Sequence, residues 1–121
     1  MPEEPNPVED ALHEPPTVED VEDAVRANIR SVLAVTNETL TDIGNLLELS
    51  VAVVGRRQRG VTPWSVAELG RLAGHWEIEV SKLFASRTTV VLSALRPGRI
   101  AQLRAAKGLP AHSRAKASVA A

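Results

Sequence analysis

The stretch LTDIGNLLELSVAVVGRRQRG, Leu40 to Gly60, carries most of the information about the fold. Its first half has apolar residues at helical spacing, and Thr39 or Thr41 is expected to cap this first helix. After Glu48-Leu49-Ser50 a second helical run ends in three arginines. The Ser50 hydroxyl is suited to begin that run, because its oxygen can accept a hydrogen bond from a free backbone amide. The pattern predicts two short helices joined by a three-residue turn.

Further helices are expected on both sides of this pair. Thr17 predicts the start of a first helix over residues 18–35. Thr62-Pro63 predicts a fourth helix ending at His75, because proline suits the first helical position. A short fifth helix is expected from Ser81. The side chains expected in the core are Val21, Val25, Ile29, Val32, Leu33, Ile43, Leu46, Leu47, Val54, Val66, Leu69, Leu72, Ala73, Leu83 and Phe84.

Composition narrows the class of protein. Of the 121 residues, 44% are hydrophobic and only three are aromatic, so the core must consist mainly of aliphatic side chains, which suits an all-α fold. No apolar run is long enough to span a membrane, and the acidic start is unlike a secretory signal, so the cytoplasm is the expected compartment. The chain has no cysteine, and its three histidines are widely spaced, so we expect no disulfide, metal site or other cofactor. The sequence lacks catalytic constellations and phosphate loops, and we expect no enzyme activity.

Charge is distributed unevenly along the chain. Residues 1–23 carry nine acids and no base, whereas residues 87–121 carry seven bases and no acid. Residues 1–16 are proline-rich and predict a disordered acidic arm. Residues 17–85 are expected to form the folded domain, and residues 86–121 a basic extension and tail. In that extension Thr88 to Leu92 fits a strand or a helical turn, and Arg99 to Gly108 fits a basic helix. A polyanionic partner and a merely solvated basic tail both remain open.

One longer run carries a family resemblance: TLTDIGNLLELSVAVVGRRQRGVTPWSVAELGRLA, Thr39 to Ala73, which continues as GHWEIEVSKLF to Phe84. From Arg26 to Phe84 the chain resembles the lambda-repressor and Cro type of helix-turn-helix DNA-binding domain, the xenobiotic-response-element family. The segment TPWSVAEL is similar to small regulators of actinobacteria and their temperate phages. The resemblance implies a five-helix all-α domain whose second motif helix enters the major groove of an operator.

This resemblance also implies which residues contact DNA. Val51 and Ala52 begin the recognition helix and can only touch a thymine methyl group, so hydrogen bonding to bases falls to Arg56, with Arg59 as a second candidate. Trp64 fits either beside the DNA backbone or in the core. Glu48 and Glu77 stand at helix ends where glycine is usual in the family, which predicts strained turns. The residues expected at the DNA are Thr41, Ser50, Val51, Ala52, Gly55, Arg56, Arg57, Arg59, Thr62 and Trp64.

The function implied is transcriptional repression, of the kind that phage immunity repressors use to control lysogeny. The expected partners are a double-stranded DNA operator, with a homodimer on DNA as a further option, and no membrane. An antitoxin-type regulator and a protein-interaction module that keeps this scaffold are the alternatives. The ending Ser118, Val119, Ala120 and Ala121 resembles a degradation tag for the host Clp protease; an alanine-rich frayed end is the other interpretation.

Overall fold

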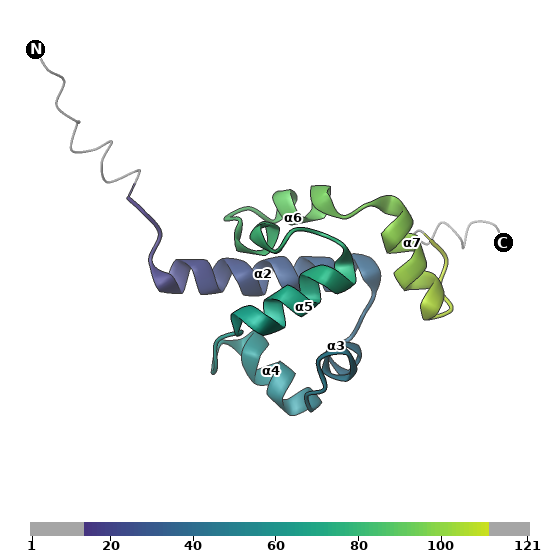
Figure 1. The fold of residues 1–121 in the computed structure, drawn as a ribbon, viewed down its shortest axis with the longest axis horizontal. Helices are drawn as coiled ribbons and strands as arrows, with labels where there is room; N and C mark the ends of the chain where they lie inside the picture. Colours follow the sequence, from purple (N-terminus) through teal and green to yellow (C-terminus); the bar gives the residue numbers. More distant parts are fainter. Residues whose placement is uncertain (1–13, 112–121) are drawn as a thin grey trace, which may run out of the picture.

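The computed structural model describes residues 14–111, which contain six α-helices and one 3-10 helix and no strand (Figure 1). In chain order the elements are α2 (Val18–Thr36), α3 (Leu40–Leu47), α4 (Val51–Arg59), α5 (Val66–Trp76), η1 (Val80–Phe84), α6 (Thr88–Ala94) and α7 (Pro97–Ala106). The all-α prediction is confirmed for this part of the chain. Most of the acidic arm and the tag-like ending, Ser118 to Ala121, lie outside the described residues. None of the described helices has the length and hydropathy needed to cross a membrane.

Capping boxes at Thr17 and Thr39 set where α2 and α3 begin. In each box the threonine hydroxyl accepts a hydrogen bond from the amide of Asp20 or Asp42, three residues later. The aspartate carboxylate in turn accepts one from the threonine's own amide. These bonds satisfy donors that have no partner in the first turn of a helix. The start predicted at Thr17 is confirmed, and Thr39 rather than Thr41 caps α3.

Helix α5 begins later than the sequence pattern predicts, and the start assigned to Thr62-Pro63 is wrong. Ser65 is the N-cap, because Glu68 completes a capping box with it. The Ser65 hydroxyl accepts from the Glu68 amide at 3.0 Å, and the Glu68 carboxylate accepts from the Ser65 amide at 2.9 Å. A helix capped at Thr62 would have a serine at the corresponding position and no carboxylate. Val66 therefore becomes the first helical residue and is 78% exposed, so its expected place in the core is also wrong.

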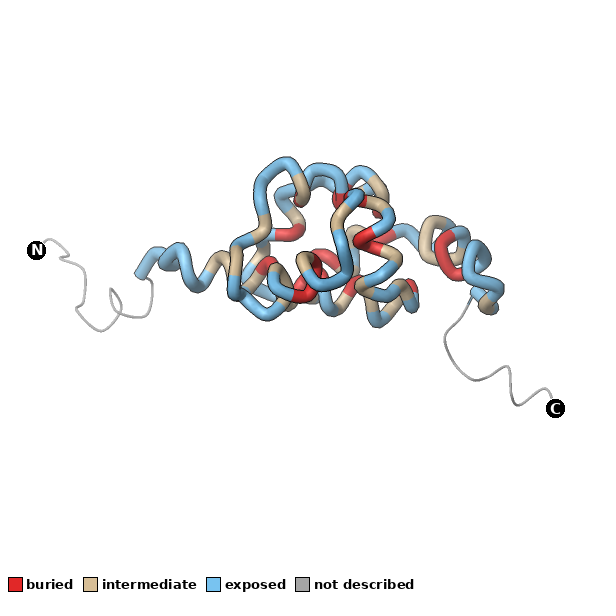
Figure 2. Tube along the Cα trace, turned by 90° about the horizontal axis from the view of Figure 1, so that it is seen from below, coloured by how far each residue is buried: buried red, intermediate tan, exposed pale blue. Residues whose placement is uncertain are grey.

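The core lies between α2 and the helices packed on both sides of it, and Figure 2 shows buried positions in the middle of the molecule and an exposed start of α2. Trp76 is fully buried. Phe84 keeps 38% of its surface exposed. The buried hydrophobic residues are Val25, Ile29, Val32, Ile43, Leu47, Val54, Leu69, Leu72, Ala73, Trp76, Leu83, Val91, Leu95 and Leu103.

The core continues past Phe84, where the five-helix expectation ends. Val91 and Leu95 from α6 and Leu103 from α7 belong to the same cluster, and both helices pack against α2. The segment that fitted a strand or a helical turn is the helix α6. Its helical character was ambiguous in the sequence, because β-branched residues in a segment of seven show no clear period.

Arginines of α7 attach this helix to the carboxyl ends of α5 and α2. Arg99 donates two hydrogen bonds to the carbonyl oxygen of His75, at 3.0 and 2.7 Å. Arg104 donates to the carbonyl oxygen of Val35 at 3.3 Å. The last carbonyls of a helix lack intrahelical partners and lie at the negative end of its dipole, so a guanidinium is favoured there. Some of the positively charged side chains in the C-terminal third therefore form hydrogen bonds that hold the helices of the fold together.

Glu38 holds the loop between α2 and α3 against the end of α5. Its side chain is only 7% exposed. The carboxylate accepts hydrogen bonds from the Thr36 hydroxyl and the Trp76 indole, both at 2.8 Å, and lies 2.6 Å from Nε2 of His75. Burial raises the pKa of Glu38, but the hydrogen bonds from His75, Trp76 and Thr36 outweigh burial and hold that pKa below its ordinary 4.5. The ionised carboxylate therefore fixes α3, and with it α4, relative to α5.

Candidate nucleic-acid interface

The turn between α3 and α4 is closed tightly against Gly44. The Leu49 amide donates to the carbonyl oxygen of Gly44 at 2.8 Å. A Cβ at Gly44 would lie 2.6 Å from the backbone oxygen of Leu49, closer than side chains tolerate. Glu48 adopts the left-handed conformation with φ 61°, which agrees with the strain expected from the sequence. Sequence reasoning missed the role of Gly44, although a glycine inside a predicted helix is a signal of close backbone approach.

One face of α4 points away from the body of the protein. The Ser50 hydroxyl caps the helix by accepting from the Val53 amide at 3.2 Å, and Val54 is fully buried beneath it. Ala52, Arg56 and Arg59 are all exposed. They are spaced by four and then three residues, which places them on a single side of the helix. Together with Val51, which is 51% exposed, these residues form what we call the outer face of α4.

The three arginines of α4 have different surroundings. Arg57 donates two hydrogen bonds of 3.0 Å to the carboxylate of Glu68 on α5, and both side chains are mostly covered. The hydrogen bond from Arg57 holds the pKa of Glu68 below its ordinary 4.5, despite burial, and the same bond raises the pKa of Arg57. Among residues 14–111, neither Arg56 nor Arg59 has a hydrogen-bond or ion-pair partner. Arg57 therefore links α4 to α5, and two of the three guanidinium groups remain available to an anion.

Gly55 lies beneath one of these arginines. It is buried, and a Cβ there would meet Nη1 of Arg59 at 3.1 Å. Since that atom is the far end of a flexible side chain, Gly55 gives Arg59 room to lie along the helix. A DNA backbone could approach Gly55 directly only if Arg59 moved aside.

Three other residues expected at the DNA lie outside α4. Trp64 is partly buried, and its indole donates to Oε1 of Gln58 at 2.9 Å, while Gln58 donates to the backbone oxygen of Arg26 at 3.2 Å. This chain of bonds ties Trp64 to α4 and α2. Thr41 is exposed in the first turn of α3, and Thr62 is partly buried after the end of α4. At the amide end of α5, the Ser65 amide donates to the Glu68 carboxylate.

The geometry is that of a helix, a turn and a second helix with an exposed cationic side. A helix with its side chains is about as wide as the major groove of DNA, roughly 12 Å. Within residues 14–111 no group of three histidine, aspartate or glutamate side chains could hold a metal ion. The outer face of α4 can therefore attract an anion through its positive charge and donate guanidinium hydrogen bonds. Two small apolar side chains lie beside these groups.

Comparison with known proteins gives one family. No curated protein and no solved structure matches the chain. The BetR domain, a helical family of helix-turn-helix type, matches residues 20–120, which take in all of the described helices except the first two residues of α2. Because this match takes in most of the sequence, the chain belongs to the BetR domain family.

Proposed function

We propose that this protein is a DNA-binding transcriptional regulator that inserts α4 into the major groove of its operator. The observation that carries this proposal is the contrast among the α4 arginines: Arg57 is bound to Glu68, whereas Arg56 and Arg59 have no partner within residues 14–111. Unpaired guanidinium groups on the outward side of a helix-turn-helix suit phosphates and guanine edges. Membership of the BetR family supports a regulatory role on DNA.

The outer face of α4 divides into two kinds of contact. Arg56 lies in the middle of this face and is assigned the base contact, a pair of hydrogen bonds to O6 and N7 of a guanine. Arg59, in the last turn, is assigned a phosphate contact. Val51 and Ala52 are exposed at the start of the helix and offer methyl groups to thymine. Specificity in this arrangement comes from few direct contacts, so operator shape is expected to contribute.

The more specific role that we propose is repression of a phage or prophage promoter, by occupying an operator and excluding RNA polymerase. It is supported by the resemblance of Arg26 to Phe84 to lambda-repressor and Cro type domains and of the segment TPWSVAEL to small phage regulators. Such a repressor would maintain lysogeny and give immunity to related phages.

The decisive experiment is a gel-shift titration with the promoter region of the protein's own gene and with a scrambled duplex of equal length. Specific binding is expected to survive about 0.2 M salt, at which non-specific binding of a basic surface is largely lost. Arg30→Ala, on an exposed position of α2, is the matched control and should leave binding unchanged. Equal binding to both duplexes, lost at the same salt concentration, would favour a protein-interaction module. Copurification of a small partner protein would favour an antitoxin.

A further inference from the structure

Two arginines on the outer face of α4 each follow, by one helical turn, a residue that carries at most a single methyl group. Gly55 precedes Arg59 by four residues, and Ala52 precedes Arg56 by four. A Cβ at Gly55 would lie 3.1 Å from Nη1 of Arg59, so the Arg59 side chain runs back along the helix over Gly55. Long side chains of a helix generally point towards its N-terminus. The same direction carries the Arg56 guanidinium over the exposed methyl group of Ala52.

The first turn of α4 is suited to contact a base through methyl groups. Residues 51–54 are all apolar, and the Ser50 hydroxyl before them accepts the capping hydrogen bond from the Val53 amide. Val51 is 51% exposed, and Ala52 is exposed beside it. In the major groove, the apolar group that a base pair presents is the C5 methyl of a pyrimidine, which thymine and 5-methylcytosine carry. A 5-methylpyrimidine is therefore the base that fits the start of α4.

The methyl contact and the arginine contact fall on neighbouring bases. The Cα atoms of Ala52 and Arg56 are about 6 Å apart along the helix axis. The backward direction of the Arg56 side chain makes the distance between the two contacting groups shorter than that, and stacked base pairs are about 3.4 Å apart. In a right-handed duplex the C5 methyl of a pyrimidine lies beside the O6 and N7 edge of the guanine that follows it on the same strand. One guanidinium can therefore bind that guanine and pack against that methyl group at the same time.

We infer that α4 reads a two-base step, a 5-methylpyrimidine followed by guanine, and that Ala52 and Arg56 together determine this specificity. The inference rests on the proposed function and deepens it, because it names the base beside the guanine assigned to Arg56. Thymine and 5-methylcytosine present the same methyl group at this position, whereas unmethylated cytosine lacks it. Methylation of cytosine in a cytosine–guanine step is therefore expected to strengthen binding, which makes recognition sensitive to DNA methylation.

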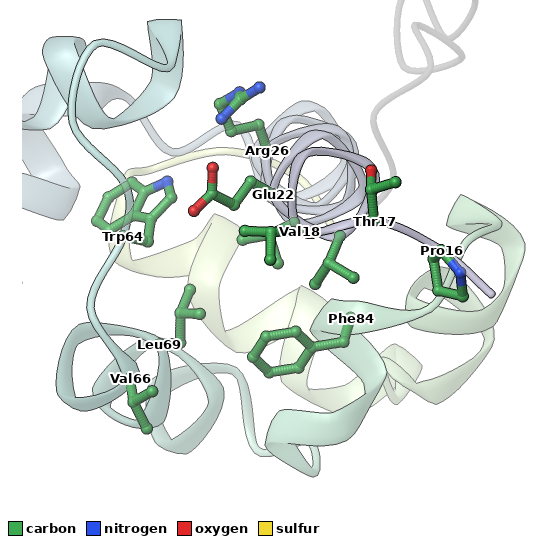
Figure 3. Close-up of a pocket in the computed structure, with 11 residues that line it drawn as sticks. Pro16, Thr17, Val18, Glu22, Arg26, Trp64, Val66, Leu69 and Phe84 are labelled. Carbon is green, nitrogen blue, oxygen red and sulfur yellow. The ribbon is translucent and has the colours of Figure 1, made fainter.

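The start of α5 supplies an internal control, because it repeats the local sequence of α4. Ser65-Val66-Ala67 corresponds to Ser50-Val51-Ala52, a serine cap followed by an exposed valine and an exposed alanine. The surroundings of the two starts differ. Val66 lines an apolar groove between α2 and α5, together with Val18 and Phe84 (Figure 3). The same three residues therefore occur once at the outer face of α4 and once away from it.

The arginine that follows each alanine by four residues also differs between the two helices. Arg71, four residues after Ala67, donates to the carbonyl oxygen of Leu46 at 2.8 Å and is held at the end of α3. Arg56 has no partner within residues 14–111. Only at the start of α4 does an exposed alanine therefore lie beside a guanidinium that is available to a base.

The test begins with the full chain and a pool of random-sequence duplexes, from which bound DNA is selected in repeated rounds. The enriched site is expected to contain a thymine–guanine step. Versions of that duplex then differ only at the pyrimidine of this step. Uracil in place of thymine removes the methyl group and keeps the pair with adenine, and it should lower affinity about fourfold, the effect of one methyl group buried. 5-Methylcytosine in place of cytosine adds the methyl group and keeps the pair with guanine, and it should raise affinity by the same factor.

Protein variants connect this preference to Ala52. Ala52→Gly removes the methyl group beneath the Arg56 guanidinium and should bring the affinities for the thymine and uracil duplexes together. Ala67→Gly is the matched control and should leave the preference for thymine unchanged. Each alanine is the second residue of its helix and is exposed, so the two substitutions have similar effects on helix stability.

Three results would overturn the inference while the proposed function stands: an enriched site without a pyrimidine–guanine step, equal affinities within both pairs of duplexes, or a thymine preference that Ala52→Gly leaves intact. In each of these the chain still binds one sequence in preference to others. Failure of the full chain to enrich any sequence from the pool would overturn the proposed function, and this inference with it.

Discussion

Arg57 and Glu68 are joined by two hydrogen bonds of 3.0 Å, which connect the helix proposed to contact DNA with the first turn of α5. The same Glu68 carboxylate accepts a hydrogen bond from the Ser65 amide and so completes the cap of α5. One side chain thus sets the start of α5 and the position of α4 relative to it. Planar guanidinium and carboxylate groups paired in this way fix orientation as well as distance.

Glu68→Gln is expected to lower the free energy of unfolding by about 1.5 kcal/mol, because the amide can keep the capping contact but loses the charged pair with Arg57. Urea denaturation followed by circular dichroism measures the change. Glu79→Gln is the control, since Glu79 is exposed and its side chain makes no capping bond. Indistinguishable unfolding free energies for the two variants would contradict the structural role assigned to Glu68.

Acid is expected to destabilise the protein through Glu38 and Glu68. The pKa of each carboxyl is lower in the folded chain than its ordinary 4.5, so folding favours the ionised forms. Their contribution is complete above that ordinary pKa and is lost as the pH falls through the lower folded pKa. Unfolding free energies measured at neutral pH, at pH about 5 and at pH about 3.5 should be similar for the first two and smaller for the third. A Glu38→Gln/Glu68→Gln double variant should show a weaker loss in acid, and an unchanged loss would rule out these two groups as its source.

Gly44→Ala is expected to destabilise the protein by about 3 kcal/mol, because the new Cβ would overlap the backbone oxygen of Leu49 and force the turn before α4 to open. Gly70→Ala is the matched control: Gly70 lies inside α5, and a Cβ there meets nothing within 4 Å. That change should stabilise the protein by up to about 1 kcal/mol, since alanine favours helix more than glycine does. Thermal melts that move in the same direction for both variants would contradict the close approach at Gly44.

Arg56→Ala and Arg57→Ala are expected to lose different properties: operator affinity in the first variant and folding stability in the second. Loss of the guanine contact assigned to Arg56 should weaken operator binding by about 1–3 kcal/mol while leaving stability unchanged. Arg57→Ala should lower stability, because its partner Glu68 is mostly covered and would lose its pair.

Arg59→Ala should lower operator and non-specific affinity alike and reduce the slope of log K against log salt by about one. Binding titrations at several salt concentrations, together with urea melts, separate these outcomes. An Arg56 variant that loses specific and non-specific affinity equally would make Arg56 a phosphate contact.

Local sequence was sufficient to predict the helix starts and several core positions in the N-terminal half of the chain. The starts of α2, α3 and α4 follow from a hydroxyl residue placed before an apolar helical run, and the core positions Val54 and Leu72 follow from the spacing of apolar residues. These features depend on residues three or four positions apart, and hydrogen bonds and side-chain contacts at that spacing form within a single helix. The start of α5 was missed because two capping signals lie three residues apart, and only the Glu68 carboxylate distinguishes them.

What the sequence determined by itself is the all-α class, the helix-turn-helix at Leu40 to Gly60 and the arginines at its end. Tertiary structure alone decided which of those arginines have a partner within residues 14–111, because the partner of Arg57 is 11 residues away on another helix. It also decided that α6 and α7 complete the core and that two exposed valines 48 residues apart, Val18 and Val66, face one groove. Contacts of this kind depend on how helices pack against one another, and the spacing of residues along one helix does not determine that packing.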